Sequence, residues 1–231
     1  MEEHSATNRR RVLAKAEQLK KSLAQPGILA ALGAALLFGS STPLAKMLLA
    51  GVSPWLMAAL LYLGSGIGLT LYRLLRRVPS ARLPRGEWPW LAGAIFTGGV
   101  LGPGLQMLGL TRMPASGASL LLNAESVFTA LLAWFVFREN CDKRIALGMG
   151  AILAGLLILS WPGEAKFSGI VPALCVLGAC FCWAIDNNLT RKVSLSDATW
   201  IASLKGLVAG AVNLALEPHF ESGNNADRFR H

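Results

Sequence analysis

The chain has 231 residues, of which 53% are hydrophobic and 15% are charged, and its mean hydropathy is +0.48. Apolar stretches of about 18 or more residues indicate membrane helices, so a soluble globular fold is excluded. The formal net charge of +9 does not indicate nucleic-acid binding, because the basic residues lie at the ends of the apolar stretches, as membrane topology places them.

Residues 1–26 form a basic segment that is predicted to be cytoplasmic. Val12, Ala16, Leu19 and Leu23 recur in it at helical spacing, with basic residues between them. The segment is therefore either an amphipathic helix lying on an anionic inner leaflet or a solvated helix. It is too polar for a cleavable signal peptide, and the apolar stretch that follows is too long for one.

Seven apolar stretches follow, each near the length that crosses about 30 Å of hydrocarbon. They cover residues 27–50, 54–74, 88–110, 113–137, 145–162, 170–190 and 199–216. Only helices satisfy their own backbone in lipid at this length and composition. We therefore predict an all-α, polytopic membrane helix bundle with about seven transmembrane helices, which is a multi-pass protein of the inner or plasma membrane.

The distribution of Lys and Arg predicts the orientation of these spans. Sixteen of the 22 lie in the N-terminal segment and in the loops after spans 2, 4 and 6, four lie on the other side, and Lys46 and Lys205 lie within spans. Cytoplasmic loops carry the excess of basic residues, so the N-terminus is predicted to be cytoplasmic and these loops to face an anionic inner leaflet.

An internal repeat relates the first and sixth spans. LGAALLFGSSTPLAK (32–46) aligns without gaps on LGACFCWAIDNNLTR (177–191), and the same offset places Trp55 on Trp200. Repeats of an odd number of helices are inverted, as in secondary transporters whose sites form between the repeats. The predicted domains are thus a first five-helix repeat (27–162), the first two helices of an inverted second repeat (170–216), and a polar tail (217–231).

Three stretches carry a family resemblance: FGSSTPLAK in span 1, LGLTRMPASGASLLLNAESVFTALLAWFVFRE into span 4, and CWAIDNNLTRKV in span 6. With them the chain resembles the EamA-type family of the drug/metabolite transporter superfamily. The resemblance implies ten helices in two inverted repeats and export of a small metabolite or drug-like solute by alternating access. Helices 8 to 10 are not in this sequence, so a C-terminally truncated member is expected. The alternative is a non-transporting remnant, or a half-size subunit that works only in an assembly such as a homodimer.

Glu125 lies near the midplane of span 4, where a charged side chain costs about 2.5–3.5 kcal/mol on insertion scales. It lies at the edge of a polar stripe that includes Asn123, Ser126 and Thr129. We interpret Glu125, Asn123 and Ser126 as part of the wall of a solute or ion pathway. The alternative is a neutral, hydrogen-bonded contact between helices.

Span 1 carries Ser41, Thr42 and Pro43, and the proline is expected to kink the helix and free a carbonyl. The repeat aligns Ser41 and Thr42 with Asp186 and Asn187, so all four are candidates for the same pathway. For Asp186 the competing interpretation is an ion pair with Arg191 near the cytoplasmic face.

Lys46 and Lys205 lie close enough to span ends to snorkel, so a pathway role is the less favoured interpretation for both. The four cysteines (Cys141, Cys175, Cys180, Cys182) lack the spacing of a metal site. The sequence has no catalytic or cofactor motif either. We therefore expect a transporter with no cofactor and no bound metal, and not an enzyme.

Overall fold

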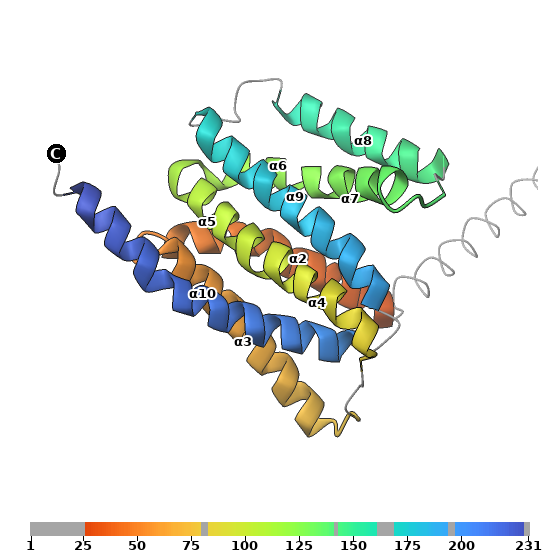
Figure 1. The fold of residues 1–231 in the computed structure, drawn as a ribbon. Coiled ribbons are helices and arrows are strands. Elements are labelled where there is room, and N and C mark those ends of the chain that lie inside the picture. The colour runs from red at the N-terminus through yellow and green to blue at the C-terminus, as the bar shows by residue number, and fades with distance from the viewer. Residues whose placement is uncertain (1–25, 80–82, 141–142, 161–168, 194–196, 229–231) are drawn as a thin grey trace, which may run out of the picture. The chain divides into compact units, whose positions relative to one another are not determined.

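The computed structural model describes residues 26–79, 83–140, 143–160, 169–193 and 197–228, and all regular structure in these ranges is helical (Figure 1). The helices are α2 (Pro26–Leu48), α3 (Pro54–Leu75), η1 (Arg85–Glu87), α4 (Trp88–Ala94), η2 (Ile95–Leu101), α5 (Gly102–Arg112), α6 (Ala115–Leu122), α7 (Ala124–Phe135), α8 (Lys143–Ser160), α9 (Ile170–Val193) and α10 (Ala198–Arg228). They fall into two compact units, up to Leu44 and from Ala45 onward, and the boundary lies inside α2.

Six helical segments of the described ranges are long and apolar enough to cross a membrane. They are Gly27–Leu48, Pro54–Leu75, Arg85–Arg112, Ala115–Phe135, Ile170–Val193 and Ala198–His219. The predicted fifth span, 145–162, corresponds to α8, whose apolar part Ala146–Gly155 is shorter than these six. The polytopic helical bundle is thereby confirmed. The basic segment 1–25, Cys141 and Lys166 lie outside the described residues.

The third span changes its helix type halfway, because it contains a proline. Pro103 has no N–H for the carbonyls of Gly99 and Gly98, which lie four and five residues before it. The preceding residues form a π-helical turn, η2, in which the Gly102 N–H donates to the Thr97 carbonyl. Such turns leave carbonyls free for other donors and occur frequently at functional sites.

The fourth span is interrupted at Asn123, where α6 ends and α7 begins. The Asn123 side chain donates to the carbonyls of Ser119 (3.1 Å) and Leu120 (3.2 Å) within its own helix. Asparagine competes with the helix ladder in this way through its short polar side chain. The polar residues near the middle of span 4 therefore coincide with a break in the helix.

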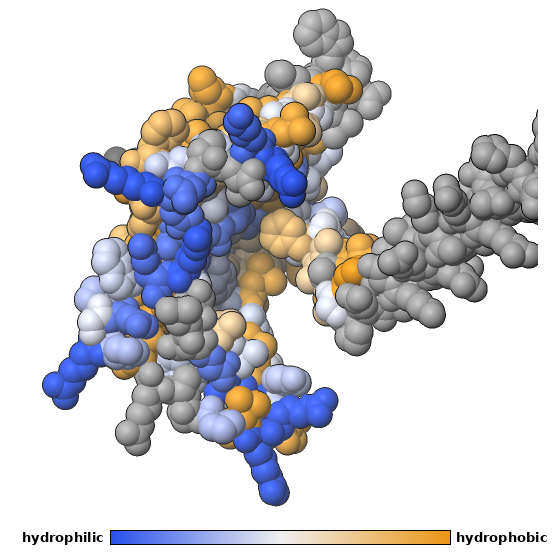
Figure 2. Space-filling view, turned by 90° about the vertical axis from the view of Figure 1, so that its right-hand side faces the viewer, coloured by the Kyte–Doolittle hydropathy of each residue, from blue (hydrophilic) through white to orange (hydrophobic). Residues whose placement is uncertain are grey.

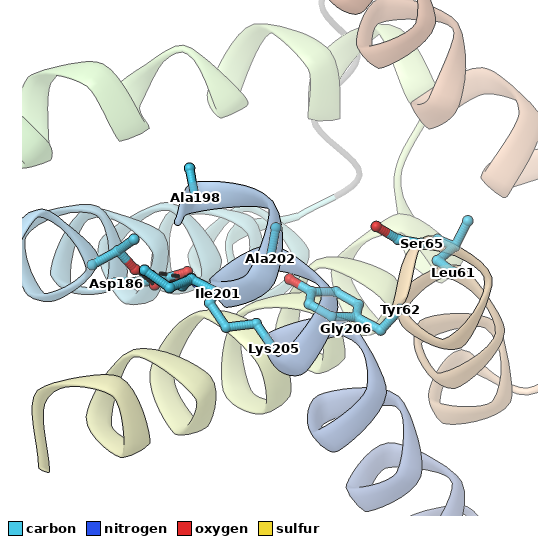
Figure 3. A pocket seen from close by; sticks show the side chains of 10 residues that line it. Leu61, Tyr62, Ser65, Asp186, Ala198, Ile201, Ala202, Lys205 and Gly206 are labelled. Atoms are coloured by element: carbon cyan, nitrogen blue, oxygen red, sulfur yellow. Dashed lines mark hydrogen bonds and ion pairs between the residues drawn. The ribbon is translucent and has the colours of Figure 1, made fainter. Parts of the chain in front are cut away.

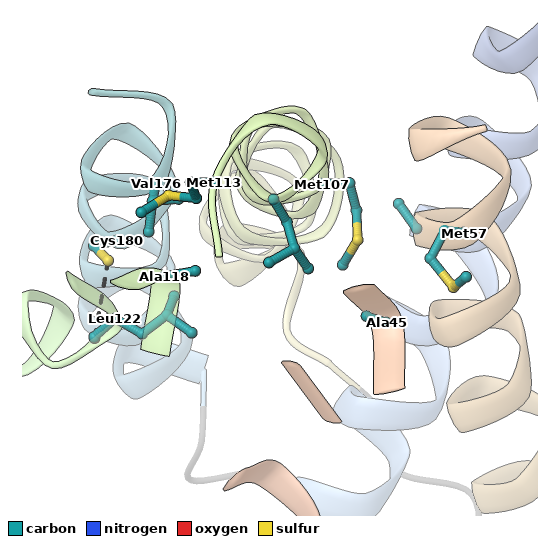
Figure 4. Packing of buried hydrophobic residues seen from close by; sticks show 10 residues of the cluster. Ala45, Met57, Met107, Met113, Ala118, Leu122, Val176 and Cys180 are labelled. Atoms are coloured by element: carbon teal, nitrogen blue, oxygen red, sulfur yellow. Dashed lines mark hydrogen bonds between the residues drawn. The ribbon is translucent and has the colours of Figure 1, made fainter. Parts of the chain in front are cut away.

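In the second unit α9 packs against α4, η2, α5, α6 and α7 (Figure 1). Side chains from α3, α5, α6 and α9 meet in its largest apolar cluster (Figure 4). Fully buried members of this cluster include Met107, Leu110, Val176 and Cys180. The cluster fixes α9 in depth and rotation, and so it orients the polar residues that follow Cys180 on the same helix.

Helices α3 and α10 cross at backbone contact, which Gly66 on α3 and Gly206 and Gly210 on α10 permit. A Cβ on Gly206 would lie 2.7 Å from the Gly66 Cα, and a Cβ on Gly210 would lie 2.7 Å from the Leu63 backbone nitrogen. Small residues allow this close approach in membrane bundles. By contrast Gly64 and Gly68, which share the same four-residue spacing, have nothing within 4 Å, so Gly66 and not that pair faces α10.

Helix α10 continues beyond the span end expected at Leu216, through Pro218 to Arg228. The first residue of the predicted polar tail, Glu217, accepts a hydrogen bond from the Ser53 hydroxyl at 3.3 Å. Ser53 also caps the start of α3, because its Oγ accepts from the Leu56 N–H at 3.2 Å. The Ser53–Glu217 hydrogen bond therefore ties the far part of α10 to the start of α3.

Basic side chains gather at one end of the second unit, where α3, α7 and α9 finish and α4, α8 and α10 begin. Figure 2 looks toward this end and shows hydrophilic side chains on it, with apolar side chains at its flanks. The exposed basic residues at these helix ends are Arg76, Arg77, Arg85, Arg138, Lys143, Arg144, Arg191 and Lys192. This is the end that the charge distribution predicts to be cytoplasmic.

Candidate functional site

The second unit contains an ion pair inside its membrane-spanning region. Lys205 on α10 donates to Asp186 Oδ1 on α9, and the two side chains are 16% and 11% exposed. The Thr190 hydroxyl completes a triangle, because it donates to Asp186 Oδ1 at 2.7 Å and accepts from Lys205 Nζ at 3.0 Å. The lysine therefore turns inward instead of extending to the membrane surface. Arg191, the partner considered for Asp186 from the sequence, instead pairs with Glu139.

A half-open pocket of about 390 Å³, here called the ion-pair pocket, adjoins Asp186 and Lys205. Figure 3 shows Asp186 from α9, Lys205 from α10 and Tyr62 from α3 around it. The remaining lining is mostly apolar or small and comprises Leu61, Ser65, Thr190, Ala198, Ile201, Ala202 and Gly206. An apolar wall with a few convergent polar groups is the usual composition of a small-molecule site.

The π-helical turn η2 contacts Asp186 and Tyr62, two of the residues that line the ion-pair pocket. A Cβ on Gly98 would lie 2.0 Å from Asp186 Oδ2, so only glycine leaves room for the carboxylate. The Gly98 carbonyl accepts from Tyr62 Oη at 2.6 Å and from Trp183 Nε1 at 2.9 Å. The Gly99 carbonyl accepts from Asn213 Nδ2 at 2.8 Å. The two carbonyls that Pro103 cannot serve thus bind side chains from α3, α9 and α10.

A second polar cluster lies where α7 meets α9. Asn187 Nδ2 donates to Glu125 Oε1 at 2.8 Å, and it lies 3.4 Å from Thr129 Oγ1. Asn188 Nδ2 donates to the carbonyls of Thr129 (3.1 Å) and Ala184 (2.8 Å). Glu125 therefore contacts the first helix of the predicted second repeat, and it does not line the ion-pair pocket.

Of the residues singled out in the sequence, Glu125 and Asn187 are in direct contact, and Asp186 lies on another side of α9. Asn123 and Ser126 are exposed. Ser41, Thr42 and Pro43 belong to the first unit, where Pro43 lies within α2 and the Ser41 hydroxyl donates to the Phe38 carbonyl at 2.6 Å.

Tyr62 and Thr190 were not identified from the sequence, and snorkelling was favoured for Lys205. Two features of the sequence bear on this site. Thr190 stands four residues after Asp186, on the same helix face. The GGVLGPG run places Pro103 where it removes the donors of Gly98 and Gly99.

An ion pair also joins α3 to the start of α10. The Arg73 guanidinium, almost fully buried, donates to Asp197 and Thr199 and, at 2.8 Å, to the Pro79 carbonyl. Asp197 also caps α10, because its Oδ1 accepts from the N–H groups of Thr199 (2.9 Å) and Trp200 (3.2 Å). Hydrogen bonds from the Thr199 side chain and from Arg73 hold the pKa of Asp197 well below its usual range.

Residues 25–161, more than half of the chain, match the EamA-like transporter family. The chain belongs to this family. EamA-type proteins are membrane transporters, and the several apolar helices of this member agree with that assignment. Among the described residues no group of three or more His, Cys, Asp or Glu side chains is arranged to hold a metal ion.

Several relatives of this EamA-type chain are named as transporters. It is 30% identical over 209 residues to an uncharacterized transporter of Methanothermobacter thermautotrophicus, over 82% of this chain and 60% of the relative. It is 39% identical over 85 residues to a probable 4-amino-4-deoxy-L-arabinose-phosphoundecaprenol flippase subunit of Pseudomonas fluorescens, over 37% of this chain and 74% of the subunit. It is 35% identical over 85 residues to a probable amino-acid metabolite efflux pump of Salmonella typhimurium, over 35% of this chain and 27% of the pump.

The chain spans about three fifths of the length of the relatives that match most of it. A solved crystal structure has a similar fold, with a TM-score of 0.57 and 22% sequence identity, over 81% of this chain and 68% of the other. This likeness concerns the fold alone.

Proposed function

We propose that this chain exports a small solute across the cell membrane by alternating access, and that the solute binds in the ion-pair pocket. The observation that carries the proposal is the Asp186–Lys205 pair, which lines a pocket between α3 of the first predicted repeat and α9 and α10 of the second. Ionisable residues inside a membrane are costly, and they mark substrate and ion pathways. Inverted-repeat transporters bind their substrates at such an interface.

Electroneutrality favours a zwitterionic solute. A solute with one charge would displace one partner of the pair and leave the other buried and unpaired, at a cost of about 3–5 kcal/mol. A small zwitterion gives an ammonium to Asp186 and a carboxylate to Lys205, so both charges stay compensated. The name of the Salmonella relative, an amino-acid metabolite efflux pump, agrees with this solute class.

Solute counterflow into vesicles that contain the purified chain tests this proposal. We expect a labelled zwitterionic amino acid to exchange at least about a hundredfold faster than its decarboxylated amine or its deaminated acid, because the unpaired charge costs about 3–5 kcal/mol and each 1.4 kcal/mol is a factor of ten. Asp186→Asn should abolish exchange. Glu139→Gln is the matched control, because it breaks the other ion pair of α9, that with Arg191, away from the pocket. Equal exchange of the three solutes, or full exchange by Asp186→Asn, would refute the proposal.

We assign to Glu125 the coupling of solute export to proton movement. It is hydrogen-bonded to Asn187 across the contact between the two predicted repeats, where a change in its protonation alters that contact. Glu125→Gln should leave counterflow intact and abolish flux driven by a pH gradient. Ser126→Ala, the exposed neighbour, should change neither. Full gradient-driven flux with glutamine at this position would make Glu125 a structural residue.

A second candidate function is that of a subunit in a lipid-carrier flippase, which the likeness to the Pseudomonas flippase subunit favours. In that case the purified chain alone would show no solute counterflow, and activity would need a second polypeptide that copurifies with it. Counterflow by a preparation whose mass in detergent is that of this chain alone would exclude the subunit role.

A further inference from the structure

Helices α3 and α10 have a second groove on the side away from the ion-pair pocket. It has a volume of about 530 Å³ and is here called the arginine groove. Its lining comprises Thr70, Arg73, Leu74, Arg77, Val78, Trp200, Ser203, Leu204 and Leu207. On α10 these residues share no position with the ion-pair pocket, which takes Ala198, Ile201, Ala202, Lys205 and Gly206. The crossing at Gly66 and Gly206 therefore separates two distinct concave surfaces.

The two arginines of the groove differ in what they bind. Arg73 is held by Asp197, Thr199 and the Pro79 carbonyl. Arg77 lies just beyond the end of α3, and within the described part of the chain its exposed guanidinium has no hydrogen-bond or ion-pair partner. Its backbone has a φ of 51°, in the left-handed region, which turns the chain out of the helix at this point. As far as the described residues go, the Arg77 guanidinium is therefore available to bind an anion at this groove.

The rest of the groove is arranged for an acyl chain. Leu74 on α3, 69% exposed, and Leu204 and Leu207 on α10 continue from Arg77 toward the membrane interior. Trp200, which packs edge-to-face on Trp88 with ring centroids 6.4 Å apart, lies at the level where aromatic belts meet headgroups. Arg77 and then the leucines of the groove therefore follow the order of a lipid headgroup and its acyl tail.

We propose that the arginine groove binds one anionic phospholipid, with its phosphate on Arg77 and an acyl chain between α3 and α10. Arginine matches phosphate through paired N–H donors, and basic pockets between transmembrane helices bind anionic headgroups. The groove lies at the end that carries most of the Lys and Arg, which is predicted to face the anionic inner leaflet. This site is independent of the solute pathway proposed above.

Native mass spectrometry of the purified chain, titrated with phosphatidylglycerol or phosphatidylcholine, measures the site directly. We expect one phosphatidylglycerol to bind about fivefold more tightly than phosphatidylcholine, since a basic residue at the surface contributes about 1 kcal/mol. Arg77→Gln should remove this preference. Arg138→Gln is the matched control, because Arg138 is also exposed, also follows a span at this end, and has a φ of 54°.

Leu204→Trp gives an independent variant, because it fills the apolar floor and leaves Arg77 in place; it should lower phosphatidylglycerol binding with Arg77 intact. Inorganic phosphate alone should not compete at millimolar concentration. Equal binding of the two lipids, equal loss in Arg77→Gln and Arg138→Gln, or full competition by inorganic phosphate would each overturn the lipid site.

Discussion

Asp186 is the residue on which the interior of the bundle depends most. Its Oδ1 accepts from both Lys205 and Thr190, while its Oδ2 lies against Gly98, a position with no room for a Cβ. An unpaired carboxylate in the membrane would cost about 2.5–3.5 kcal/mol even on insertion scales. The pair is therefore a requirement of folding as well as the proposed solute ligand.

Lys205→Met should lower the free energy of unfolding by about 3–5 kcal/mol, because it leaves Asp186 buried and unpaired. The double variant Asp186→Leu, Lys205→Met should recover most of that loss, since apolar replacements of a whole buried pair are often neutral or stabilising. Equilibrium unfolding in mixed micelles measures both. If the double variant is as unstable as Lys205→Met, burial of the lone carboxylate is not the cause of the lowered free energy of unfolding.

Gly98→Ala should destabilise the bundle by about 1–3 kcal/mol, the usual cost of overpacking, and should displace Asp186 from Lys205. Gly64→Ala is the control, because a Cβ at Gly64 meets nothing within 4 Å and alanine is the better helix former. The unfolding midpoints of the two variants in detergent should therefore shift in opposite directions. Equal tolerance of both substitutions would contradict the close packing of α9 on η2.

Helix α10 is held to α3 at three levels: by Arg73–Asp197 at its start, by Gly66–Gly206 in the middle, and by Ser53–Glu217 further along. Because the two backbones touch at Gly66 and Gly206, α10 has little freedom to slide along α3. The two helices are therefore expected to move as one arm in any transport cycle, although they belong to different predicted repeats.

The contact at the start of α10 should depend on pH. The pKa of Asp197 is depressed in the folded state, so its stabilising contribution is fully present above the ordinary aspartate pKa of about 3.9 and is lost as the pH falls below that value. The difference in unfolding midpoint between the wild type and Asp197→Asn should accordingly be constant from pH 7 to 5 and shrink below about pH 4. A difference that stays constant down to pH 3 would contradict the depressed pKa.

The sequence predicted the starts and breaks of helices where neighbouring residues in the chain determine them. Ser53 and Pro54 are a cap and a first-turn proline, and α3 begins there as expected. Asn123 broke the apolar run of span 4, and the helix breaks at that residue. After Leu216 the sequence becomes polar, but helix α10 continues to Arg228, and Glu217 accepts a hydrogen bond from Ser53.

The candidate site was predictable only in part, because its contacts depend on helix rotation. Composition indicates that Asp186 and Lys205 lie in membrane helices, but their pairing depends on how α9 and α10 turn about their axes. That rotation is set by the packing of Cys180 and Val176 in one case and by the contact of Gly206 with Gly66 in the other. Glu125 and Asn187 were both identified, but nothing local indicated their direct contact.

For the molecule as a whole, the charge distribution makes a prediction about sidedness. Gly86→Cys, in the loop between α3 and α4, should be labelled only from the cytoplasm, and Gly51→Cys, between α2 and α3, only from outside. Both positions are exposed, so access and not burial decides the result. Impermeant maleimide on intact cells and on inverted vesicles, with the native cysteines replaced, measures it. Labelling of position 86 in intact cells would reverse the orientation.

The Asp186–Lys205 pair also bears on how the protein is made. The two residues are 19 positions apart. At about 5–20 residues per second, the ribosome therefore adds Lys205 about one to four seconds after Asp186. During that interval α9 carries a carboxylate whose counter-charge does not yet exist, and insertion of α9 alone is opposed by the cost of a lone charge in lipid. Helices α9 and α10 are therefore expected to leave the translocon as a hairpin, with α9 held at its lateral gate until α10 arrives.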